Sequence, residues 1–118
     1  MIVGLGVDVV DLARFERAVS RTPRLRERLF AESERQLSLR SLAARFAAKE
    51  ALVKALGDAE DVHWVDMVIA SDHTGNPSFV VSGPLGGLLE RRGIAALHVS
   101  MSHDAGVAVA TVVAEARG

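Results

Sequence analysis

The sequence predicts a single α+β domain in which a mostly antiparallel sheet packs against one main helix. Three observations support this prediction. The length of 118 residues fits one domain, β-rich apolar segments lie near both ends, and an Ala- and Leu-rich middle segment favours a helix. Apolar residues make up 49% and charged residues 25% of the chain. This is ordinary globular usage, which excludes disorder as the main state.

The first half of the chain predicts one strand followed by helices. Residues 2–10 are almost continuously apolar up to Asp8, which predicts a buried strand. Asp11 can cap a helix over roughly residues 12–20, and Pro23 suits the first turn of a short helix over 23–30. The longest helical stretch begins at Ser33 and ends at Gly57. An interruption over 38–41 leaves 42–56 as its firmest part.

The second half predicts a hairpin, a short helix and two further strands. Residues 64–71 and 78–82 form the hairpin strands around a turn over 72–77. A short helix over 84–92 ends at Gly93. Strands over 96–102 and 106–114 follow, joined at 103–106.

Several classes of protein are excluded by what the chain lacks. Without cysteine it has no disulfide framework, thiolate zinc site or cysteine nucleophile. No apolar run approaches the roughly 20 residues of a membrane helix, and residues 1–8 lack the basic region of a signal peptide. We therefore expect a cytoplasmic protein without a membrane partner.

Charge is divided unevenly between the halves. Residues 1–54 carry nine Arg and two Lys against seven acidic residues, whereas residues 55–118 carry three Arg against eight. The basic excess either docks an acidic partner or forms a solvated helix face. Nucleic acid is disfavoured, since four Phe, one Trp and no Tyr provide no base-stacking platform. The excess lies mainly in Arg14, Arg17, Arg21, Arg24, Arg26 and Arg28.

Two segments bring charged residues into structured regions. Asp8 interrupts an apolar strand, so its carboxylate lies near a strand end, pairs with a cation or binds a metal. On the middle helix, Glu50 and Lys54 share one face, as an exposed ion pair or as part of a site. Arg45 and Lys49 form a like-charge pair one turn apart, which is unfavourable unless an anion joins them.

Further polar residues have weaker patterns. His103 ends a predicted strand, where it acts as acid, base or phosphate donor, or as a turn residue bonded to Asp104. Gly4-x-Gly6 lacks the third Gly of a dinucleotide-binding fingerprint. We expect Trp64 and Phe79 in the core.

Three segments in this order resemble the holo-acyl-carrier-protein synthases, the small bacterial class of 4′-phosphopantetheinyl transferases. They are GLGVDVVDL (4–12), RFAAKEALVKALG (45–57) and VSMSHD (99–104). Asp66–Ile69 and Gly75–Pro77 also resemble the family's hairpin, so the resemblance spans essentially the whole chain. It implies a phosphopantetheinyl transferase fold and a Mg²⁺-dependent transfer. The phosphopantetheine arm of coenzyme A moves to a serine of apo acyl carrier protein, and adenosine 3′,5′-bisphosphate is released.

The resemblance also implies roles for individual residues. Asp8 and Glu50 match the metal-binding carboxylates, and two carboxylates suit a partly hydrated Mg²⁺. Glu50, through a metal-bound water, is the candidate base, and Lys54 matches a catalytic lysine near the phosphates. His103 matches a histidine beside the nucleotide and is the third candidate catalytic residue. The expected coenzyme contacts are Arg45, Lys49, Lys54, Gly57, Gly75, Asn76, Pro77 and His103.

Partners follow from the same resemblance. Arg14 matches an arginine that grips the acidic carrier protein, and Arg21, Arg24 and Arg28 extend this patch. The family forms homotrimers that hold the coenzyme between subunits, and the turn at Gly75 reaches in from a neighbour. Two rival hypotheses are a non-catalytic carrier-binding trimer and a transferase with another diphosphate donor. The segment 35–44 departs from the family pattern, because it is shorter than in usual members. The resemblance therefore implies no nucleotide contacts for this segment.

Overall fold

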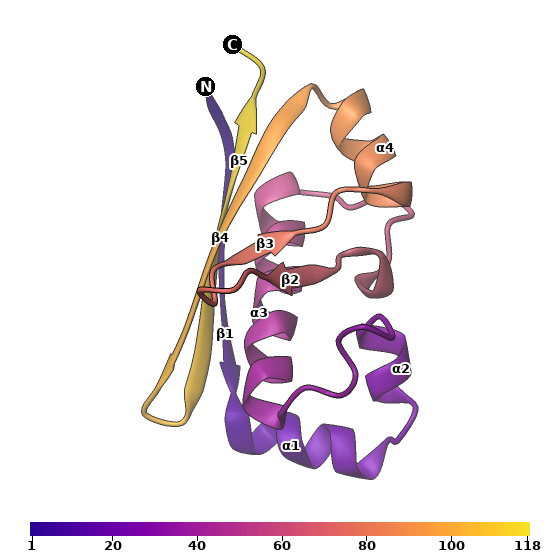
Figure 1. The fold of residues 1–118 in the computed structure, drawn as a ribbon, viewed down its shortest axis with the longest axis vertical. Coiled ribbons are helices and arrows are strands. Elements are labelled where there is room, and N and C mark those ends of the chain that lie inside the picture. Colours follow the sequence, from indigo (N-terminus) through magenta and orange to yellow (C-terminus); the bar gives the residue numbers. More distant parts are fainter.

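The computed structural model describes the whole chain, Met1–Gly118. A three-stranded antiparallel sheet lies against one face of the long helix α3 (Leu39–Leu56), and the β2–β3 hairpin crosses that helix and contacts β4 of the sheet (Figure 1). The sheet has the order β1–β5–β4, formed by β1 (Ile2–Asp11), β4 (Ile94–Asp104) and β5 (Val107–Ala116). The predicted α+β domain with one main helix is confirmed.

The contact between β1 and α3 depends on two glycines. A Cβ atom at Gly6 would lie 1.9 Å from the Ala51 carbonyl oxygen, and one at Gly4 would lie 2.1 Å from that of Ala55. The strand therefore approaches the helix backbone more closely than any side chain allows. Because side chains alternate along a strand, Asp8 points to the same face as these glycines, toward α3.

The prediction that β1 is buried is wrong for the single chain. The side chains on its outer face, Val3, Leu5, Val7 and Val9, are exposed. No element covers this face, because α3 packs only on the inner face of the sheet (Figure 1).

Helix α3 begins later than predicted. Residues 32–36 form turns rather than helix, and Ser38 is the N-cap, its hydroxyl accepting a hydrogen bond from the Ser41 N–H at 3.2 Å. The segment 38–41 starts the helix instead of interrupting it. Gly57, with φ +80°, ends the helix as predicted.

Two shorter helices pack near the start of α3. Helix α1 (Leu12–Arg21) begins at the predicted cap, where the Asp11 carboxylate accepts from the Arg14 N–H at 2.8 Å. Helix α2 (Leu25–Leu29) is shorter than the predicted 23–30. No helix is long and apolar enough to cross a bilayer.

The predicted hairpin is present but shorter. Trp64–Asp66 form the 3₁₀ turn η1 in place of a strand, so β2 is only Ile69–Ser71, paired with β3 (Pro77–Phe79). The prediction of a core position for Trp64 is wrong, because this side chain is 39% exposed, whereas Phe79 is buried as predicted. Helix α4 (Gly83–Arg91) then leads to β4.

Candidate active site

A cleft of about 520 Å³ opens between the end of β1, helices α1 and α2, and the middle of α3. Its walls are mainly apolar, and the charged groups are concentrated on two sides. Asp8 and Glu50 line it from β1 and α3, whereas Arg14 and Arg28 line it from α1 and α2. The cleft thus joins the predicted metal-binding carboxylates to part of the predicted carrier patch.

Lys54 completes the polar part of the site. Its Nζ donates to Asp8 Oδ1 and to the Val7 carbonyl oxygen, both at 3.0 Å. Glu50 lies one helical turn before Lys54 on the same face of α3. The sequence prediction that Asp8 pairs with a cation is confirmed, and the structure brings all three residues together.

The electrostatics of this site favour a bound cation. Burial raises the pKa of the Glu50 carboxyl, and the Asp8 charge raises it further, against the effects of the Trp64 side chain and Lys54. A positive ion beside Glu50 would favour the charged form of this carboxyl. No group of three His, Cys, Asp or Glu residues is present, so the donor set is small. It suits Mg²⁺, which takes one or two carboxylates and completes its shell with water and substrate phosphates.

Lys49 and Arg45 do not lie in this cleft. Lys49 is fully buried, and its ammonium donates to Glu34 Oε1 at 2.6 Å, to the Leu29 carbonyl at 2.7 Å and to the Trp64 carbonyl at 3.0 Å. All three of its N–H donors are used, which leaves none for a phosphate. The structure therefore argues against the predicted contact of Lys49 with coenzyme A.

Arg45 is also buried and faces the same carboxylate. Its Nε lies 3.8 Å from Glu34 Oε2 and donates to the Ile69 carbonyl at 3.4 Å, while Nη2 donates to Ser71 Oγ at 3.3 Å. The anion that relieves the Arg45–Lys49 repulsion is thus Glu34 of the protein itself, not a phosphate. Sequence reasoning missed Glu34, although the like-charge pair was a signal that a buried anion had to exist.

The remaining predicted coenzyme contacts lie outside the cleft. His103 is exposed near the end of β4, and Gly57 is exposed after α3. Gly75 and Asn76 are exposed in the β2–β3 turn, and Pro77 begins β3. None of these residues lines the cleft that holds Asp8 and Glu50.

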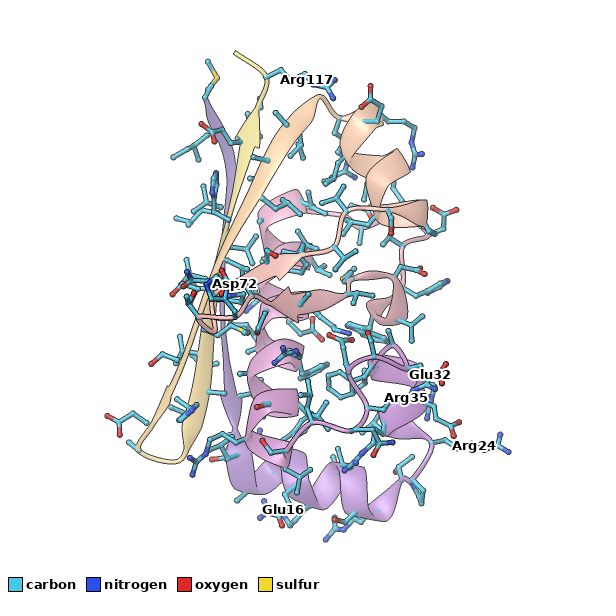
Figure 2. The ribbon with its side chains drawn as sticks, in the orientation of Figure 1. Glu16, Arg24, Glu32, Arg35, Asp72 and Arg117 are labelled. Carbon is cyan, nitrogen blue, oxygen red and sulfur yellow. The ribbon has the colours of Figure 1, made fainter.

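The predicted carrier patch is divided between the cleft and its surroundings. Arg14 and Arg28 line the cleft, while Arg21 and Arg24 do not. Arg24 projects away from the body of the protein (Figure 2). All four side chains are exposed, and none of them forms an ion pair within the chain. They are available to an acidic partner.

Comparison with known proteins identifies the family. The model of the 4′-phosphopantetheinyl transferase superfamily matches residues 4–112. The chain belongs to the 4′-phosphopantetheinyl transferase superfamily. The resemblance inferred from the sequence is confirmed, and the protein is an enzyme of the transferase class.

Similar proteins of this superfamily match over almost their whole length. The holo-acyl-carrier-protein synthase of Leifsonia xyli subsp. xyli is 62% identical, over 98% of each chain. The crystal structure of the Neisseria meningitidis holo-acyl-carrier-protein synthase superposes with a TM-score of 0.89 at 34% identity, covering 98% of this chain and 99% of that one. The Helicobacter pylori synthase, in complex with coenzyme A, gives 0.83 at 32% identity, covering 94% and 99%.

Proposed function

We propose that this chain is a holo-acyl-carrier-protein synthase that transfers the 4′-phosphopantetheine arm of coenzyme A to a serine of apo acyl carrier protein. The observation that carries the proposal is the cleft that holds Asp8 and Glu50, with Lys54 bonded to Asp8 and unpaired Arg14 and Arg28 on its rim. The similar proteins from Leifsonia and Neisseria carry the same function in their names.

In the proposed reaction the serine oxygen attacks the phosphorus that carries the pantetheine arm. A new O–P bond forms, the bridging P–O bond of the diphosphate breaks, and adenosine 3′,5′-bisphosphate leaves with the bridging oxygen. Glu50 is the candidate base for the serine proton. Lys54 uses two of its donors on Val7 and Asp8, so the third is free for a phosphate oxygen.

Asp8 and Glu50 are the residues that would hold Mg²⁺. When bound there, the ion would neutralise diphosphate charge and stabilise the departing phosphate. Coenzyme A contacts from Arg45, Gly57, Gly75, Asn76, Pro77 and His103 remain predictions. For Arg45 such a contact requires the side chain to rearrange, because its guanidinium already bonds Ile69 and Ser71. A cytoplasmic location also stays a prediction.

We also propose that the protein works as a homotrimer. The apolar outer face of β1 is uncovered in one chain, and the predicted coenzyme contacts are dispersed over its surface. Packing this face against neighbouring subunits would bury the exposed Leu5, Val7 and Val9, and could place the Gly75 turn of one subunit at the cleft of the next. The number of three subunits comes from the family resemblance.

Intact-mass spectrometry tests the function directly. Wild-type protein, coenzyme A, Mg²⁺ and apo acyl carrier protein should give a carrier that is heavier by one phosphopantetheine group. A carrier that binds but gains no mass would support the non-catalytic rival. A second mixture offers the enzyme other diphosphate donors. If the carrier gains mass there and coenzyme A analogues do not inhibit this gain, the result would support the rival hypothesis of a transferase with another diphosphate donor.

A further inference from the structure

Glu34 and Lys49 form a buried ion pair that links several backbone segments. Glu34 is 1% and Lys49 0% exposed, and Lys49 also lies over the Phe30 ring, 4.8 Å from its centre. One oxygen of Glu34 accepts from Lys49 and from the Ala31 N–H at 3.0 Å, and the other accepts from the Ile69 N–H at 3.2 Å. With the carbonyls of Leu29 and Trp64 that Lys49 reaches, the pair binds four backbone groups.

Two of these groups belong to the walls of the cleft. The Leu29 carbonyl is at the end of α2, next to Arg28, and the Trp64 carbonyl is at the start of η1. Arg28, Leu29 and Trp64 all line the cleft, and so does Glu50, the neighbour of Lys49 on α3. The ammonium of Lys49 therefore connects α2 and η1 to the helix that carries Glu50.

The energetics separate this pair from an ordinary core contact. Burying two charges costs several kcal/mol per ion before their attraction is counted, so ion pairs of this kind are poor sources of stability compared with apolar side chains. What they provide is directional bonding, since a carboxylate and an ammonium together offer fixed acceptors and donors. Neither loop involved, 30–38 or 57–63, contains a helix or strand, although the Arg35 side chain also donates to the carbonyls of Glu27 and Phe30.

We infer that the Glu34–Lys49 pair is a positioning device that sets where α2 and Trp64 stand relative to Glu50. The inference rests on the proposed function, because it assigns the pair an effect on that transfer. Neither residue touches substrate. Their effect acts through the backbone of Leu29 and Trp64, and a displacement of about 1 Å at a reacting site can cost about 100-fold in rate.

Two variants test the inference by different changes. Lys49→Met removes all three donors at similar volume. Glu34→Asp keeps the charge but is one methylene too short to bond Lys49, Ala31 and Ile69 at the same time. If Lys49→Met does not fold, Glu34→Asp alone tests the positioning role. Folding is checked by circular dichroism, and transfer by kcat and KM at a temperature where each variant is fully folded.

The only tryptophan of the chain, Trp64, reports the position of the cleft wall. In the folded variants we expect kcat/KM to fall about tenfold or more and the Trp64 emission and its quenching by acrylamide to change. Ile94→Ala, a buried change at the far end of β4, is the control that destabilises the fold but keeps wild-type emission and kcat/KM.

The outcomes distinguish the inference from the proposed function. A folded Glu34→Asp with wild-type emission and kcat/KM would overturn the positioning role while leaving the transferase assignment intact. Wild-type protein that transfers nothing would overturn the proposed function instead. In that case the Trp64 emission of the variants still decides whether the pair positions the cleft wall.

Discussion

Glu50 is the residue on which the proposed chemistry depends most. The Glu50→Gln variant keeps the size of the side chain but removes the proton acceptor and one metal ligand. We expect transfer to fall by about 100-fold or more, with acyl carrier protein binding largely unchanged. Intact-mass time courses and calorimetric titration with the carrier measure these two quantities. A normal transfer rate would show that Asp8 and Glu50 are not the metal site.

Arg14 is the residue on which the proposed binding of the carrier protein depends most. Arg14→Ala should weaken carrier affinity several-fold, and the wild-type affinity should fall as salt rises, because an exposed charge acts through a screened field. Arg91→Ala, an exposed arginine of α4 that pairs with Glu60, is the matched control and should leave affinity unchanged. Equal affinities of Arg14→Ala and wild type would contradict the docking role.

Individual residues differ in how far the sequence predicts them. The shared face of Glu50 and Lys54 was predictable from the turn of a helix, whereas the place of Asp8 beside them came from the family resemblance. The role of Lys49 was not, because its partner Glu34 lies 15 residues earlier in a loop and reaches it only through the tertiary fold. A pattern within one helix shows that a charge needs a partner but cannot show which one.

At the scale of elements, the close contact of β1 with α3 holds Asp8 beside Lys54. Gly6→Ala would place a Cβ atom 1.9 Å from the Ala51 carbonyl oxygen, so strand and helix must separate. We expect a loss of about 1–3 kcal/mol in the free energy of unfolding, measured by urea denaturation, and a reduced transfer rate. Gly86→Ala on α4, where the nearest atom is 3.8 Å away, is the control and should not destabilise.

The β2–β3 turn carries a pH-dependent element. The carboxylate of Asp72 (Figure 2) accepts from the Thr74 hydroxyl and from the N–H groups of Thr74 and Asn76, and these bonds lower its pKa. A carboxyl with a lowered folded pKa supports the turn at neutral pH and loses that support only as pH falls below its usual range. The turn should therefore stay ordered at mildly acidic pH, and the NMR amide signals of Thr74 and Asn76 should keep their neutral-pH chemical shifts.

Asp72→Ala tests the same turn at neutral pH. Because the turn is exposed, we expect the melting temperature to stay close to wild type. If the turn contacts coenzyme A, the KM for coenzyme A should rise while kcat changes little. Ser78→Ala, at a neighbouring exposed position of β3, is the control. An unchanged KM in Asp72→Ala would remove Gly75, Asn76 and Pro77 from the proposed coenzyme contacts.

Element boundaries show what the sequence leaves open. The start of α1 at Asp11 and the end of α3 at Gly57 were predictable, because each depends on one local cap. The start of α3 was placed too early, since the helix-favouring residues 33–37 form turns around the buried Glu34. Residues 64–66 form a 3₁₀ turn instead of a strand, and Trp64 in this turn lines the cleft.

At the scale of the whole molecule, the nearly continuous apolar run of β1 predicted a buried strand, but in one chain only one face of this strand is covered. Gly4, Gly6 and Asp8 face α3, whereas Leu5 and Val7 face outward and are 63% and 48% exposed. A row of exposed β-branched and leucine side chains on one face of a sheet marks an interaction surface. The proposed trimer would therefore make the sequence prediction right in the assembly, although it is wrong in the isolated chain.

The substitution Leu5→Asp tests the assembly. In an isolated chain this exposed side chain costs little to replace, so the fold measured by circular dichroism should be retained. In a trimer built on the outer face of β1, it would place three carboxylates in an apolar contact, which is unfavourable without partners.

We expect sedimentation to show a trimer for wild type and a monomer for Leu5→Asp, with transfer lost because the proposed site is shared with a neighbouring subunit. Val81→Asp, at an exposed position outside this sheet face, should remain trimeric and active. A monomeric wild type with full activity would contradict the shared site, and an active trimeric Leu5→Asp would place the interface on another surface.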